Sequence, residues 1–128
     1  MVKKLLALGG DGIGPEVLES GLRILETVSK GIKVNFDIDF DLIGGICWDK
    51  YGTFCRNITI QKAKEVDAIL VGAVGGPKWD AMKIKGDPVD QDGLMCLRKK
   101  LDTFFGIRPI KYYKSLHKII PFYRKNVQ

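Results

Sequence analysis

The stretch Gly9-Gly10-Asp11-Gly12-Ile13-Gly14-Pro15 constrains the fold of this chain more than any other feature. It follows the apolar run 5–8 and precedes a helical pattern of apolar residues at 17, 18, 22, 25 and 28. Glycine permits a sharp turn and a close approach of the backbone, and proline suits a first helical turn because its missing N–H costs nothing there. A strand, a glycine turn and a helix are typical of nucleotide-binding α/β folds, where the turn lies at the carboxyl edge of a sheet.

The spacing of these glycines does not reproduce the dinucleotide-binding pattern G-x-G-x-x-G. No glycine in register follows Gly10, Gly12 and Gly14. The free N–H groups of a first helical turn favour an anion or a polar ligand edge. Taken alone, however, the stretch slightly favours an ordinary strand-to-helix turn over a ligand-binding turn. Two later stretches of the sequence shift the preference toward ligand binding.

Length and composition bound the class of protein. The chain has 128 residues, enough for one small domain or part of a larger one, and its 45% apolar and 28% charged residues are typical of a globular protein. No apolar run reaches the roughly 20 residues that span a bilayer. The N-terminus resembles a signal peptide, but Asp11 ends the apolar segment too early, which indicates a first buried strand in a cytosolic protein.

The cysteines and the charge exclude two further classes of site. Cys47, Cys55 and Cys96 are odd in number and lack C-x-x-C spacing, which argues against a disulfide framework and a zinc site. The net charge of +6 is concentrated at the end, with nine Lys or Arg against one acid from Arg98 onward. Such a segment is compatible with nucleic acid, with acidic partners or substrates, or with a neutralising part of the protein elsewhere.

The hydrophobic pattern predicts an α/β architecture with a mostly parallel sheet and flanking helices. Strands are expected at 3–8, 34–42, 67–72 and 104–112, and helices at 15–29, 58–64 and 92–103, with a turn at 49–52. Gly31 is the expected end of the first helix. In strand 34–42 the even positions are predicted to face inward, and the acids at 37, 39 and 41 to form a solvated face.

Two further stretches carry candidate functional residues. The segment 73–80 directly follows a buried strand, a position where loops often carry function. Leu94 and Arg98 lie four residues apart on a helix capped by Asp92, so they share one face. Leu94, Leu97 and Leu101 form the apolar stripe of that helix.

Three blocks together resemble the 3-isopropylmalate dehydrogenases, a branch of the β-decarboxylating dehydrogenases that also include isocitrate and tartrate dehydrogenases. They are residues 10–17 (GDGIGPEV), 67–80 (DAILVGAVGGPKWD) and 93–111 (GLMCLRKKLDTFFGIRPIK). The resemblance implies a partial fold of that family, with residues 1–103 forming an incomplete part of the first, NAD-side domain and 104–128 beginning the second. It also implies NAD-dependent oxidation and decarboxylation of 3-isopropylmalate in leucine biosynthesis, in a cytoplasmic homodimer that binds no nucleic acid and no membrane.

The same resemblance assigns roles residue by residue. Arg98 and Arg108 look like arginines that hold substrate carboxylates, and Leu94 like the residue that packs on the isopropyl group. A guanidinium binds a carboxylate bidentately, and an aliphatic wall favours an aliphatic substituent. The expected lining of the cofactor cleft is Ile13, Gly14, Ala73, Val74, Gly75, Gly76 and Gln91.

The chain departs from the family's pattern in three ways. Gln91 stands where the family usually has an acid near the nicotinamide, and proline is absent around residues 54–55. The catalytic tyrosine and lysine and the ligands of Mg²⁺ or Mn²⁺ are expected outside these residues, so the isolated chain is predicted to be inactive. A sister enzyme acting on tartrate, malate or homoisocitrate, or a non-enzymatic basic binding module, are the alternative hypotheses.

Overall fold

A computed structural model of the chain describes residues 1–82, 92–111, 113 and 115. Within this part, a parallel sheet has the strand order β2-β1-β3, formed by β1 (Val2–Gly10), β2 (Asn35–Asp41) and β3 (Ala68–Ala73). β1 pairs with both neighbours, for example Leu5 with Ile38 and Leu6 with Ile69. The predicted α/β class with a parallel sheet is confirmed.

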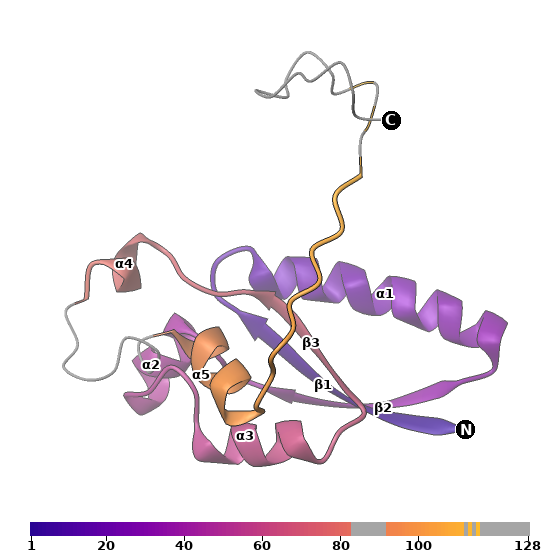
Figure 1. The fold of residues 1–128 in the computed structure, drawn as a ribbon, viewed down its shortest axis with the longest axis horizontal. Helices are drawn as coiled ribbons and strands as arrows, with labels where there is room; N and C mark the ends of the chain where they lie inside the picture. The colour runs from indigo at the N-terminus through magenta and orange to yellow at the C-terminus, as the bar shows by residue number, and fades with distance from the viewer. Residues whose placement is uncertain (83–91, 112, 114, 116–128) are drawn as a thin grey trace.

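Helices cover both faces of this sheet (Figure 1). Helix α1 (Gly14–Ile32) joins β1 to β2, and α3 (Asn57–Lys64) joins β2 to β3. Because β2 and β3 lie on opposite sides of β1, right-handed crossovers put these two helices on opposite faces. Helices α2 (Gly45–Tyr51) and α5 (Gly93–Lys100) lie on the α3 side, and α4 (Pro77–Asp80) follows β3.

The core lies mainly on the α3 side of β1. Leu6 and Leu8 are fully buried there, together with residues from α3, from α5 and from the connections before and after α2: Ile43, Cys55, Ile60, Ala63, Cys96 and Leu97. Leu5 and Ala7 alternate to the opposite face and are also buried. β1 is therefore apolar on both faces because both are covered, which confirms the expectation for the first strand.

Two local predictions are wrong. The first helix continues through Gly31 to Ile32, because the N–H of Lys33 still bonds to the carbonyl of Ser29. Lys33, and not Gly31, takes the left-handed conformation that ends the helix, with φ 55°. The expected turn at 49–52 belongs instead to α2, which Gly52 ends with φ 67°. Both helices therefore end where a left-handed residue lets the chain leave.

The alternation of β2 also fails at its carboxyl end. Phe40 is 59% exposed, although it was expected to face inward. The side chain of Asp41, expected in solvent, is only 3% exposed and pairs with Arg56 and Thr59. Burial alone would raise the pKa of Asp41, but hydrogen bonds from Leu42, Arg56 and Thr59 outweigh it and lower that pKa.

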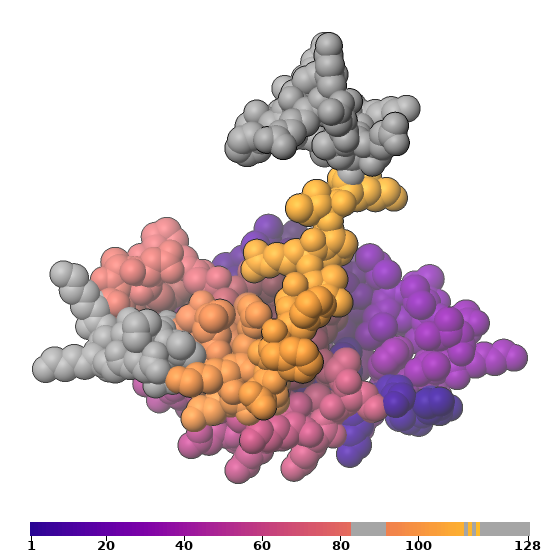
Figure 2. Space-filling view, in the orientation of Figure 1, coloured from indigo at the N-terminus to yellow at the C-terminus, as the bar shows by residue number. Residues whose placement is uncertain are grey.

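The predicted strand 104–112 is absent over the part that the structure describes. Residues 103–111 run away from the packed body (Figures 1 and 2), and Phe104, Phe105, Ile107 and Ile110 are all more than 70% exposed. A strand needs a neighbouring strand to pair with, and this segment has none among the described residues. The remainder of the basic end from 116 lies outside the described residues.

Candidate functional site

The three parallel strands end at one edge of the sheet, and the connections that follow them are joined there by the carboxylate of Asp11. This residue is only 3% exposed. Its Oδ2 accepts hydrogen bonds from the N–H groups of Gly45 and Gly75, both at 2.8 Å, and its Oδ1 accepts one from Ile46 at 2.7 Å. One carboxylate thus connects the segments that follow β1, β2 and β3.

The glycine turn packs tightly against the end of β3. The N–H of Asp11 donates to the carbonyl of Ala73 at 2.6 Å, and the N–H of Gly14 to the carbonyl of Asp11 at 2.8 Å. A Cβ at Gly72 would overlap the carbonyl oxygens of Gly9 and Gly14, so the backbones cross in contact. Ile13 is 63% exposed, so the turn presents an aliphatic side chain outward.

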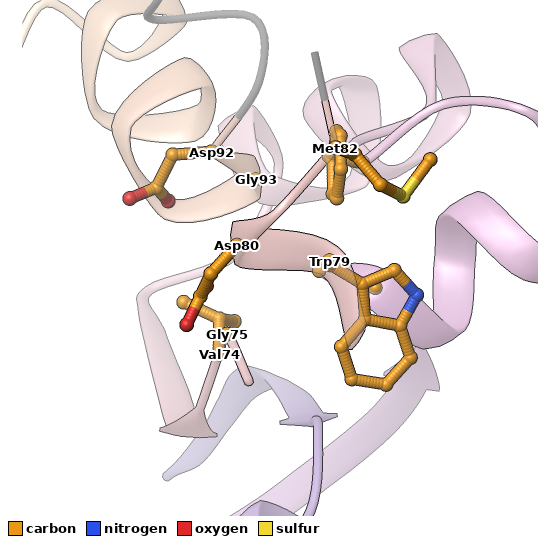
Figure 3. A pocket seen from close by; sticks show the side chains of 10 residues that line it. Val74, Gly75, Trp79, Asp80, Met82, Asp92 and Gly93 are labelled. Atoms are coloured by element: carbon orange, nitrogen blue, oxygen red, sulfur yellow. The ribbon is translucent and has the colours of Figure 1, made fainter. Parts of the chain in front are cut away.

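A pocket of about 250 Å³ opens beside these connections (Figure 3). Its lining combines the β3 connection with α4 and with the start of α2 and α5: Gly44, Gly45, Phe54, Val74, Gly75, Trp79, Asp80, Met82, Asp92 and Gly93. Asp92 caps α5 by accepting bonds from the N–H groups of Leu94 and Met95 at 2.9 and 3.2 Å. The predicted Asp92 cap is confirmed, and it fixes the start of α5 at the pocket.

The candidate cofactor residues that the structure describes lie along one edge of the sheet. Ile13 and Gly14 begin α1, and the turn that contains them contacts Ala73, the last residue of β3. Val74 and Gly75 line the pocket. Gly75 and Gly76 have φ values of 101° and 156°, a conformation that favours glycine. Gln91 lies outside the described residues.

The candidate substrate residues are separated into two groups. Leu94 and Arg98 are both half-buried on α5. Arg108 is exposed on the segment 103–111, and neither arginine forms an ion pair within the described part of the chain. That segment passes near Arg98, because a Cβ at Gly106 would lie 3.7 Å from its Nη2.

Two acids at this edge, Asp11 and Asp49, were not among the candidate residues predicted from the sequence. Asp49 accepts from Lys78 at 2.6 Å and from the indole N–H of Trp79 at 3.2 Å. Their partners lie 29 to 64 residues away in the chain. A single acid inside a glycine turn after a buried strand was the available signal for Asp11. No such local signal marks Asp49.

The described residues offer no metal site of the usual kind. No group of three His, Cys, Asp or Glu side chains among them could hold an ion. The three cysteines are buried and not in disulfides. Burial, the largest cause, raises the pKa of the Cys55 thiol to about 12, so this thiol is unreactive. Within the described ranges, no helix is long and apolar enough to cross a bilayer.

Comparison with known families assigns this architecture. The family described as isocitrate/isopropylmalate dehydrogenase matches residues 4–128. The 3-isopropylmalate dehydrogenase of Bacillus subtilis is 42% identical over 121 residues, covering 94% of this chain and 33% of that protein. The one from Dehalococcoides mccartyi strain 195 is 45% identical over 113 residues, covering 88% and 30%. The chain thus spans about a third of the length of these relatives.

Solved structures share the fold. A β-decarboxylating dehydrogenase from Thermococcus kodakarensis in its apo form superposes with a TM-score of 0.60 at 24% identity, covering 78% of this chain and 27% of that one. An isocitrate dehydrogenase from Methylococcus capsulatus gives 0.55 at 20% identity, covering 70% and 24%. These likenesses confirm the expected fold.

Proposed function

This chain belongs to the isocitrate/isopropylmalate dehydrogenase family, and we propose from that premise that it is the N-terminal part of an NAD-dependent 3-isopropylmalate dehydrogenase. Such an enzyme oxidises and decarboxylates 3-isopropylmalate in leucine biosynthesis. The observation that carries the proposal is the connected sheet edge, where the turn at Ile13 and Gly14 meets the connection after β3. At this edge of open α/β sheets, ligands bind in the crevice beyond the strand ends.

The residues at this edge fit a nicotinamide dinucleotide in two respects. Ile13 offers an exposed aliphatic surface for a flat ring or a ribose, and Gly75 and Gly76 let the backbone approach a ligand closely. NAD would supply the hydride acceptor. The chain's own part is to orient it with Ile13, Gly14 and residues 73–76, and the contribution of Gln91 stays a prediction.

The substrate end of the proposed site lies on α5. Leu94 and Arg98 are four residues apart in this helix and are both half-buried, so an aliphatic and a cationic group share one face. This pair suits a molecule that has a branched alkyl group and a carboxylate. Arg108 would be a second carboxylate ligand only if the segment 103–111 folds back over α5.

The remaining parts of the proposal concern the whole enzyme. Mg²⁺ or Mn²⁺ would polarise the 2-oxo group before decarboxylation, but the described residues do not fit a metal, so its ligands would come from elsewhere. We place the enzyme in the cytoplasm as a homodimer that takes a small-molecule substrate, with no role for nucleic acid or a membrane. The isolated chain is expected to reduce no NAD.

A chimera tests this function directly. Residues 4–111 of this chain would replace the matched region of the Bacillus subtilis 3-isopropylmalate dehydrogenase, and NAD reduction would be measured with 3-isopropylmalate, malate, tartrate and homoisocitrate in the presence of Mg²⁺. We expect 3-isopropylmalate to give the highest kcat/KM. A folded chimera that prefers another of these acids would assign the chain to a sister enzyme, and Leu94→Ala would show whether the aliphatic wall sets the preference.

A further inference from the structure

Trp79 lies at the junction between the connection after β3 and helix α2. A Cβ at Gly45 would overlap the indole ring, so the ring rests directly on the first residue of α2. Gly45 and Asp49 are four residues apart and share one face of that helix. The indole N–H donates to Asp49 Oδ1 at 3.2 Å. Trp79 thus contacts α2 through both its ring and a hydrogen bond.

Lys78 completes the contact. Its ammonium group lies 2.6 Å from Asp49 Oδ2, so each carboxylate oxygen receives one donor from adjacent residues of α4. The same ammonium group lies 5.2 Å from the centre of the Trp79 ring. The bond from Lys78, and next that from Trp79, hold the pKa of Asp49 below its usual range. The carboxylate therefore stays charged through mildly acidic conditions.

The segment held in this way is the one that shapes the pocket. Gly75, Trp79, Asp80 and Met82 all line it (Figure 3). The start of the segment is fixed separately, because the Gly75 N–H donates to Asp11. Between these two anchors lie Gly76, with φ 156°, and Pro77. A glycine followed by a helix of only four residues does little to fix the direction of the chain. The position of α4 therefore depends on the second anchor, which is the contact of Lys78 and Trp79 with Asp49.

We propose that Asp49 is a positioning residue. Its bonds to Lys78 and Trp79, called the latch below, hold α4 against α2 and thereby set the pocket wall opposite α5. The latch itself is argued from the contacts of Asp49 alone. Its effect on NAD rests on the proposed function, in which residues 73–76, directly before α4, orient the cofactor.

The test uses the indole N–H of Trp79 in the ¹⁵N-labelled chain, with Trp48→Phe to leave one tryptophan signal. In Asp49→Ala this proton should shift upfield and exchange with water roughly tenfold faster, the equivalent of one charge-assisted hydrogen bond. Asp49→Asn, which keeps an acceptor oxygen, should recover most of the protection. Lys78→Ala should raise the midpoint of the acid titration of the indole signal without removing its protection. Asp37→Ala, an exposed acid on β2, is the matched control.

The latch is overturned if the indole signal of Asp49→Ala matches that of Asp37→Ala, or if the signal does not titrate with acid. The link to the cofactor is tested in the chimera, which supplies the parts of the proposed site that lie outside residues 4–111. A KM for NAD that rises in Asp49→Ala but not in Asp37→Ala supports both the latch and the proposed function. An intact latch in the labelled chain, with a KM for NAD that Asp49→Ala leaves unchanged in an active chimera, refutes the link to the cofactor and leaves the latch in place.

Discussion

Replacing Asp11 should be among the most destabilising changes in the described part of this chain. Its buried carboxylate is the common acceptor for N–H groups from the segments after β2 and β3. In Asp11→Ala all three donors lose their acceptor at once. In Asp11→Asn the amide oxygen can keep the position of Oδ2, which serves Gly45 and Gly75, while the amide nitrogen faces the N–H of Ile46.

The magnitude follows from the burial of each donor. The bond from Gly45 is buried and those from Ile46 and Gly75 are partly buried. Leaving one buried donor unpaired costs about 1–3 kcal/mol, and losing two partly hydrated bonds adds about 0.5–1.5 kcal/mol each, so Asp11→Ala should lose roughly 2–6 kcal/mol. Asp11→Asn should lose about half of that. Because small domains have about 5–15 kcal/mol in total, the alanine variant sits near the limit of folding.

Urea unfolding followed by circular dichroism measures both variants, with Asp37→Asn and Asp37→Ala as controls. Asp37 is exposed on β2, so its variants should stay within about 0.5 kcal/mol of the parent. Hydrogen exchange should also rise at the amide of Ile46 in Asp11→Asn, before global unfolding, because this N–H loses its acceptor oxygen. If Asp11→Ala is as stable as the Asp37 controls, the carboxylate does not hold the three connections together.

Two further predictions concern Asp41 and Arg98. The folded pKa of Asp41 is lowered, so its contribution to stability is complete above the unfolded value of about 3.9 and is lost as the pH falls through the folded value. The urea midpoint of the parent should therefore fall more steeply below about pH 4 than that of Asp41→Asn, and equal slopes would contradict this. In the chimera, Arg98→Lys should lower kcat/KM by a factor that corresponds to a loss of roughly 2–5 kcal/mol of transition-state stabilisation, if the guanidinium meets a desolvated carboxylate. Lys100→Arg is its control, and a loss no larger than in the control would remove Arg98 from the substrate site.

The order of the sheet elements could be predicted because their signals are local. The alternation over 34–42 and the apolar runs at 5–8 and 67–72 identify three strands, and two intervening helical patterns make them parallel. The cap at Asp92 is equally local, since its Oδ1 accepts from the N–H groups two and three residues further along the chain. For these elements, neighbouring residues supply most of the information.

The site at the sheet edge could not be predicted in this way. Asp11 was visible only as the acid that ends an apolar run, because its hydrogen-bond donors lie 34 to 64 residues away. The sequence pattern places Asp41 on a polar face with the other acids of the strand. Its burial follows from bonds to Arg56 and Thr59, which lie 15 and 18 residues further along the chain. Helix α2 was hidden by a glycine pair and a turn-like sequence, although Gly44 and Gly52 prove to be its two ends.

The segment 103–111 shows most clearly where local pattern stops being sufficient. Its large apolar residues predict a strand, yet Phe104 and Ile110 are each 97% exposed. Pro109 also lacks an N–H to donate to a ladder. A propensity becomes a strand only when a neighbour offers paired N–H and C=O groups. The same argument separates the two candidate arginines. Arg98 is placed by α5, which Asp92 caps and Leu97 anchors in the core. The position of Arg108 depends on the surface against which the segment 103–111 packs. Carboxylate binding by Arg108 therefore requires such a surface to hold this segment beside Arg98.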